Sequence, residues 1–190
     1  MKIEQFVMAY GVEHDRLRAI LPEGFESLRP VLRINAEIRD GKHGYLEFNT
    51  AAARDGRKGW INIGCWDHIP FYTEGKKVTF ANELIEISFG RVGIAGSCPA
   101  EKDNEGCWFA DGVFCKAETI TSNKEFCDCS FRWLTEDGTC GKSIGETLPA
   151  YPEDVLNNYP KEQFTIKNAA KIPCRQVLGT YAVIFERQID

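Results

Sequence analysis

The sequence contains no long hydrophobic run and no excess of basic residues. A helix that crosses a membrane needs about 18 or more apolar residues, and no segment approaches that length, so we expect no membrane span. The formal net charge is −5, which argues against a nucleic-acid partner because such proteins present basic surfaces. The first residues, MKIEQFVMAYGVEHDRL, lack a long apolar stretch, so we expect no secretory signal and a cytoplasmic protein.

Motifs that hold a cofactor are also missing. The three histidines are scattered along the chain at His14, His43 and His68. No pair of cysteines is separated by two intervening residues, the Cys-x-x-Cys spacing that is common in zinc sites. Gly141-Lys142-Ser143 matches the end of a phosphate-binding loop, but Glu136 stands where that loop requires its first glycine. We therefore expect no metal and no other cofactor.

Cysteine, by contrast, is abundant, with eight residues in the chain. A chain of 190 residues with 43% hydrophobic residues can bury a core without disulfide bonds. Cys127 and Cys129 lie two positions apart, so on a strand they share one face, as small buried hydrophobic residues do. Zinc bound by these two residues with Cys140 is the alternative. We expect the cysteines to be free thiols.

Most predicted elements are β-strands joined by short turns. In VLRINAEIR, apolar residues alternate with Arg33, Asn35 and Glu37, so the polar residues share one face of a strand. Further strands or hairpins are predicted over 43–52, 59–66, 78–89, 91–98, 107–120, 126–134, 164–169 and 174–187. Helices are predicted after a cap at His14 or Asp15, ending at Pro22, and over 152–158.

This order of elements predicts one domain spanning residues 1–190. Strands follow each other through short turns without intervening helices, which favours a mainly β (α+β) fold with a mostly antiparallel sheet. We expect that sheet to close or pack on itself as a β-barrel, accompanied by two or three short helices.

The segment FYTEGKKVTF, residues 71–80, places Lys76 and Lys77 side by side. One interpretation is a solvated turn between two strands, since charged pairs beside glycine are common in turns. The alternative is a reactive amine. A neighbouring ammonium group and an apolar environment both lower the pKa of a lysine, and a neutral amine can form a Schiff base with a carbonyl compound.

Residues 9–48, AYGVEHDRLRAILPEGFESLRPVLRINAEIRDGKHGYLEF, resemble the start of the acetoacetate decarboxylase-like superfamily. A short helix ends in a Leu-Pro-x-Gly-Phe segment and is followed by an extended strand and a Tyr-x-Glu strand, here Tyr45-Leu46-Glu47. A lysine pair that leads into a strand comes later, as in the family.

The resemblance implies a conical, mainly antiparallel β-barrel with a small central pocket. It also implies decarboxylation of a β-keto acid through a Schiff base, with Lys76 as the nucleophile, Lys77 as its neighbour and Glu47 as the acid. The family places an arginine near the substrate carboxylate before the first helix. This chain has none in residues 1–10, and Arg33 and Arg39 are the candidate replacements.

Two main function hypotheses follow. The first is an enzyme that acts on a β-keto acid or related carbonyl compound through Lys76. The second is a non-catalytic barrel that binds a small apolar or acidic ligand. In both cases the partner is a small molecule. An aromatic-rich edge of the sheet would also allow a homo-oligomer.

Overall fold

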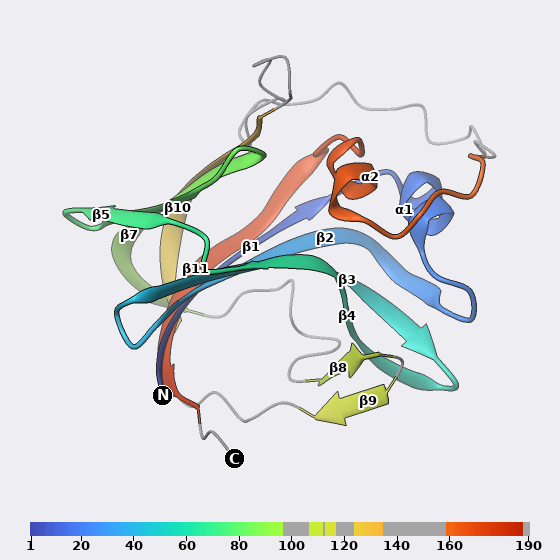
Figure 1. Ribbon diagram of the computed structural model, residues 1–190, viewed down its shortest axis with the longest axis horizontal. Helices are drawn as coiled ribbons and strands as arrows, with labels where there is room; N and C mark the ends of the chain where they lie inside the picture. Colours follow the sequence, from blue (N-terminus) through green and yellow to red (C-terminus); the bar gives the residue numbers. More distant parts are fainter. Residues whose placement is uncertain (97–106, 112, 117–123, 135–158, 188–190) are drawn as a thin grey trace.

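The computed structural model describes residues 1–96, 107–111, 113–116, 124–134 and 159–187. In these residues eleven strands form a single sheet with the order β5-β6-β7-β10-β11-β1-β2-β3-β4-β8-β9 (Figure 1). Neighbouring strands are antiparallel except β4 and β8, which are parallel. The mainly β class with a mostly antiparallel sheet is therefore confirmed. The strands are β1 (Lys2–Gly11), β2 (Glu26–Arg39), β3 (His43–Arg54), β4 (Arg57–Asp67), β5 (Phe71–Glu74), β6 (Lys77–Ala81), β7 (Ile85–Gly96), β8 (Cys107–Ala110), β9 (Val113–Lys116), β10 (Lys124–Trp133) and β11 (Gln176–Glu186).

The first helix, α1 (His14–Ile20), follows the sequence prediction closely. Leu17 and Ile20, on its apolar face, are buried, and so is Leu21 just beyond its end. Its cap is Glu13, not His14 or Asp15 as predicted, and the Glu13 side chain makes no capping hydrogen bond. The helix ends at Ile20, and Leu21 is extended because the residue before a proline is disfavoured in the helical region.

Two other predicted elements differ in the structure. The strand predicted over 78–89 is broken near Asn82, whose Oδ1 accepts hydrogen bonds from the backbone N–H groups of Leu84 and Ile85. The predicted boundary at Gly90, between the strands over 78–89 and 91–98, is absent. β7 continues through Gly90 and is paired there with β6 and β10. The turn is therefore made at Asn82, whose side chain accepts hydrogen bonds from the backbone that follows it, and not at Gly90.

The strand predicted over 164–169 is instead the start of helix α2 (Ile166–Ala170). Thr165 caps this helix, because its hydroxyl accepts a hydrogen bond from the Asn168 backbone N–H. The predicted helix over 152–158 lies outside the described residues. No helix in the described ranges is long and apolar enough to span a membrane.

The sheet curls strongly around one of its two faces. Phe48 on β3 stacks on Trp133 of β10 with ring centroids 4.9 Å apart, although β2, β1 and β11 lie between these strands in the sheet. This concave face carries the main core, which includes Phe6, Ile34 and residues of both helices. Within the described residues the hydrogen-bond ladder does not join β5 to β9, so the predicted closed barrel is not confirmed.

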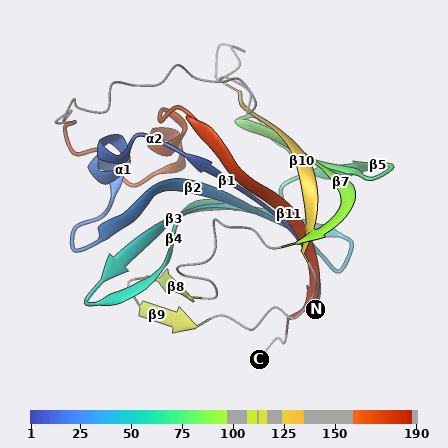
Figure 2. The same cartoon turned by 180° about the vertical axis from the view of Figure 1, so that it is seen from behind.

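The two helices pack on the concave face of the sheet, whereas the β8–β9 hairpin extends the sheet at its β4 edge. Figures 1 and 2 show α1 and α2 next to each other above β2, with the β8–β9 hairpin on the other side of β4. Because side chains alternate along a strand, every second residue of β2 and β3 faces away from the helices. That second face carries the polar residues from which the candidate site is built.

Candidate functional site

Three neighbouring strands present a group of polar side chains on the face opposite the helices. The register places Asn35 of β2 opposite Glu47 of β3, and Glu47 opposite Cys65 of β4. Residues directly opposite one another point to the same face of a sheet. Asn35 and Asn49 are buried, whereas Cys65 is exposed, so the group is reached from the β4 side. We call the group of Asn35, Tyr45, Glu47, Asn49, Trp60, Asn62 and Cys65 the Glu47 cluster.

Glu47 is the centre of this cluster. Its Oε1 accepts hydrogen bonds from Asn35 Nδ2 and Asn49 Nδ2, both at 2.9 Å. Its Oε2 accepts hydrogen bonds from the Tyr45 hydroxyl at 2.7 Å and from Asn62 Nδ2 at 3.0 Å. A carboxylate has about four lone-pair sites, so the four donors occupy all of them. The side chain is therefore fixed in a single orientation.

Tyr45 acts as a donor in this arrangement. Burial, the charge of the Glu47 carboxylate and the nearby Cys65 thiol raise the pKa of the Tyr45 phenol far above its ordinary value. The phenol consequently keeps its proton at neutral pH. Its ring is covered by the Arg39 guanidinium, whose central carbon lies 3.9 Å from the ring centroid. Tyr45 thus has little freedom to leave Glu47.

Two buried polar atoms of the cluster lack a hydrogen-bond partner in the described part of the chain. They are Asn35 Oδ1, an acceptor, and Trp60 Nε1, a donor. Both residues are at least nine-tenths buried, with 5% and 3% of their surface exposed. The Arg33 guanidinium also lies over the Trp60 ring, with its central carbon 3.9 Å from the ring centroid. Buried polar groups normally have hydrogen-bond partners, so these two atoms are exceptions to that rule within the cluster.

A second carboxylate, Glu37, lies farther along the same face of β2 and has charged partners. Arg187 donates hydrogen bonds to both of its oxygens, at 2.8 and 3.1 Å, and Arg39 Nε donates one at 2.8 Å. Burial alone would raise the pKa of this carboxyl, but the two guanidinium groups outweigh burial and hold the pKa below its ordinary value. Glu37 is 2% exposed, so this network is structural.

Of the site residues predicted from the sequence, only Glu47 lies in this cluster. Lys76 and Lys77 lie at the turn of the β5–β6 hairpin, where both are exposed. Lys77 is opposite Glu74 in the ladder, and Gly75, at φ 61°, makes the turn. No hydrogen bond or ion pair in the described residues joins either lysine to Glu47. Figure 1 shows this hairpin at the edge of the sheet.

The described cysteines are free thiols, and no group of ligands for a metal ion occurs among the described residues. Cys98 and Cys140 lie outside the described residues. Burial raises the pKa of the Cys127 thiol to about 11 and also raises that of Cys129. Both thiols are therefore protonated at neutral pH, which makes them poor nucleophiles.

Sequence reasoning did not find the donors that hold Glu47. Tyr45 and Asn49 are spaced two residues on either side of Glu47 in one strand, so the alternation along β3 could have revealed them. Asn62 could not be placed in this way, because the β3–β4 register shifts between Phe48 and Asn49. Only the folded sheet shows which residues of β4 are opposite Glu47.

Several solved structures are similar to this chain. Acetoacetate decarboxylase from Legionella pneumophila subsp. pneumophila str. Philadelphia 1 matches with a TM-score of 0.54 and 14% identity, covering 97% of this chain and 81% of its own. The enduracididine biosynthesis enzyme MppR, complexed with pyruvate, matches with a TM-score of 0.51 and 13% identity, covering 96% and 84%. An acetoacetate decarboxylase-like enzyme from Sphingomonas wittichii RW1 matches with a TM-score of 0.50 and 11% identity, covering 97% and 88%.

No protein-family model and no curated protein matches the sequence. The likenesses therefore come from three-dimensional structure, and they extend over nearly the whole chain. They confirm, at the level of the fold, the resemblance seen in residues 9–48. The chain has the acetoacetate decarboxylase-like fold.

Proposed function

We propose that this protein binds a small carbonyl compound, such as a keto acid, at the Glu47 cluster. The observation that carries the proposal is a carboxylate fixed by four donors beside two buried polar atoms that have no partner in the described residues. Unsatisfied buried groups cost about 1–3 kcal/mol each. A ligand that offers an acceptor to Trp60 Nε1 and a donor to Asn35 Oδ1 would remove that cost.

The charge near the cluster suits an acidic ligand at one end. The Arg33 guanidinium lies over the Trp60 ring, and arginine recognises carboxylates through paired N–H groups. A ligand carboxylate would bind on this side, away from the negative charge of Glu47. This orientation places the carbonyl end of the ligand toward the amide side chains of the cluster.

The hydrogen bonds of Glu47 favour a binding role for this residue over proton transfer. All its lone-pair sites are taken, so it could accept a proton from a ligand only after losing a present donor. Asn62 is the exposed donor of the four, and we propose that a ligand displaces Asn62 first. These contacts support the non-catalytic alternative of the two function hypotheses.

The similar structures support the ligand class. One of them is an acetoacetate decarboxylase, and another, MppR, is complexed with pyruvate. Acetoacetate and pyruvate are both small keto acids. Because the identity to each is below 15%, their ligands indicate only which compounds to test first on this chain.

Calorimetric titration with pyruvate and with acetoacetate tests the proposal. In Glu47→Gln an amide nitrogen replaces one carboxylate oxygen and faces two donors, so the cluster must rearrange. We expect Glu47→Gln to weaken binding at least about tenfold, equivalent to about 1.4 kcal/mol. Glu23→Gln, at an exposed residue, is the matched control and should bind like the parent protein. Equal binding by all three proteins, or binding by none, would refute the proposal.

We propose Schiff-base formation at Lys76 as a second function. Its support is the adjacent pair of amines and the position of that pair before a strand, as in the sequence resemblance. Incubation with acetoacetate and borohydride should then add the mass of the reduced adduct to the peptide containing Lys76, and Lys76→Ala should abolish it. If the adduct is absent, or if it forms equally on other exposed lysines, Lys76 has no such role.

A further inference from the structure

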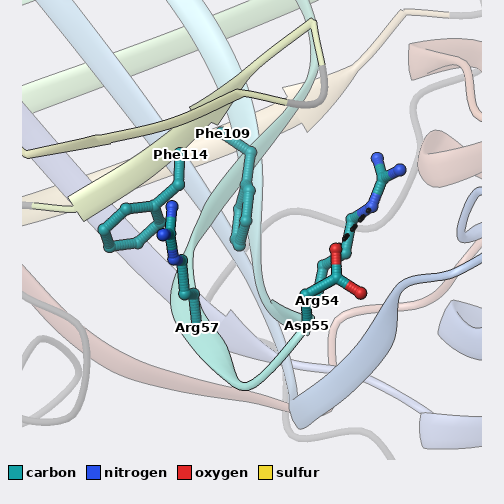
Figure 3. Close-up of a pocket in the computed structure, with 5 residues that line it drawn as sticks. All are labelled: Arg54, Asp55, Arg57, Phe109 and Phe114. Atoms are coloured by element: carbon teal, nitrogen blue, oxygen red, sulfur yellow. Dashed lines mark ion pairs between the residues drawn. The ribbon is translucent and has the colours of Figure 1, made fainter.

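The turn between β3 and β4 forms a pocket with the β8–β9 hairpin, separate from the Glu47 cluster. It has a volume of about 290 Å³ and is lined by Arg54, Asp55, Arg57, Phe109 and Phe114 (Figure 3). We call it the Arg57 pocket. It shares no residue with the Glu47 cluster, so the two sites can be tested independently.

Aromatic rings make the apolar wall of the Arg57 pocket. Phe109 is 5% exposed, and its ring contacts those of Phe25 and Phe114 edge to face, with centroids 5.1 and 5.6 Å apart. Gly59 lets this wall approach β4, because a Cβ there would lie 3.2 Å from the Phe109 ring and from the Cys107 carbonyl oxygen. The wall is therefore held in place by packing.

The two arginines of the pocket differ in their partners. Arg54 forms an ion pair with Asp55 at 3.6 Å, and Figure 3 shows its guanidinium turned away from Phe114. Arg57 lies over the Phe114 ring, with its guanidinium carbon 5.2 Å from the centroid. Within the described ranges no carboxylate is paired with Arg57. The pocket thus offers a positive group beside aromatic rings, with its own carboxylate already engaged.

We propose that the Arg57 pocket binds a small aromatic carboxylate. Arg57 pairs with the carboxylate, and Phe109 and Phe114 contact the ring. Ligand pockets usually measure about 300–1,000 Å³, so this volume lies at the lower limit and suits a ligand with a single ring. A guanidinium can donate two parallel hydrogen bonds to a carboxylate, which selects an acid over a neutral aromatic compound.

Titration of the ¹⁵N-labelled protein with benzoate, followed by NMR, tests this proposal. We expect saturable shifts of the Arg57 and Phe114 amide signals, with weaker binding of acetate, which lacks the ring, and of benzyl alcohol, which lacks the charge. Arg57→Gln should weaken benzoate binding at least about tenfold, because the charge-assisted hydrogen bonds to the carboxylate are lost. Arg18→Gln, on the exposed face of α1, should bind like the parent protein.

Two further variants keep the result decisive. Asp55→Asn removes the negative charge of the pocket and should strengthen benzoate binding, whereas Phe114→Leu should weaken it. The dispersion of the NMR spectrum reports whether each variant is folded. If benzoate does not bind, if acetate binds equally well, or if folded Arg57→Gln binds benzoate as tightly as Arg18→Gln, the proposal is wrong. Loss of pyruvate binding in Glu47→Gln would not affect this outcome.

Discussion

The two carboxylates on the polar face of β2 and β3 have opposite kinds of partner. Glu37 is bonded by the guanidinium groups of Arg39 and Arg187. Among the described residues, the hydrogen-bond partners of Glu47 are all neutral donors, three amides and a phenol. Charged partners compensate a buried carboxylate electrostatically, whereas neutral donors satisfy its hydrogen bonds and leave its charge in place. This difference makes Glu37 a structural residue and Glu47 the candidate for contact with a ligand.

At the residue scale, Glu37 should make the stability of the protein depend on pH. Its folded-state pKa is lower than the ordinary value of 4.5, so the unfolded chain takes up the proton first as the pH falls. The stabilisation is therefore complete above about pH 4.5 and is lost as the pH falls through the folded pKa. Urea denaturation at a series of pH values should show the free energy of unfolding decreasing over this interval.

Glu37→Gln should remove this part of the pH dependence and lower the free energy of unfolding at pH 7. We expect a loss of about 1.5–3 kcal/mol, the usual contribution of hydrogen bonds to charged groups. Glu26→Gln, at an exposed position of β2, should leave the profile unchanged. An identical pH profile for Glu37→Gln and the parent protein would show that the Arg39 and Arg187 contacts do not stabilise the fold.

At the scale of elements, the connection from β4 to β5 passes very close to β3. A Cβ on Gly44 would lie 2.1 Å from the Ile69 carbonyl oxygen and 3.0 Å from the Phe71 ring. Because the Ile69 carbonyl oxygen belongs to the backbone, no side-chain rotation could relieve this clash. Only glycine permits this approach, which brings one edge of the sheet over the start of β3.

Gly44→Ala should therefore destabilise the protein by at least about 1–3 kcal/mol, the typical cost of overpacking. The matched control is Gly90→Ala in β7, where the nearest atom would be 3.9 Å away and the expected change is within about 0.5 kcal/mol. Thermal and urea denaturation would measure both. Equal stability of the two variants would mean that the Ile69 backbone moves away at little cost.

At the scale of the whole molecule, the strands are joined to the sheet to very different extents. β1 is paired along nearly its whole length with both β11 and β2. In the described part of the chain, the ladder between β4 and the β8–β9 hairpin consists of the pairs Trp60–Trp108 and Ile61–Phe109. Local opening requires less free energy where fewer backbone hydrogen bonds and contacts must break.

Hydrogen exchange measured by mass spectrometry should consequently find the amides of β8 and β9 exchanging faster than those of β1 and β2. Saturation with benzoate should slow exchange in the hairpin if the Arg57 pocket is occupied, because the ligand would join it to the β3–β4 turn. Equal protection of peptides from β1 and from β8 in the unliganded protein would contradict this ranking.

Local patterns in the sequence were sufficient for many of the elements. The alternation in VLRINAEIR predicted the polar face of β2, and Pro22 predicted the end of the first helix. The segment 107–120, predicted as a strand or hairpin, contains β8 and β9. The errors occurred where a side chain bonds nearby backbone, as Asn82 does in the β6–β7 turn and Thr165 does at the start of α2.

The sequence by itself determined the mainly β class and the alternation of polar and apolar faces, whereas Glu47 was suggested by the family resemblance. Only the tertiary structure decided which side chains surround Glu47, because its donors come from three strands whose register includes an irregularity. It also decided that Lys76 and Lys77 are exposed at a hairpin turn. Alternation along one strand is a local property of the backbone, whereas the neighbours of a side chain depend on how separate strands pair.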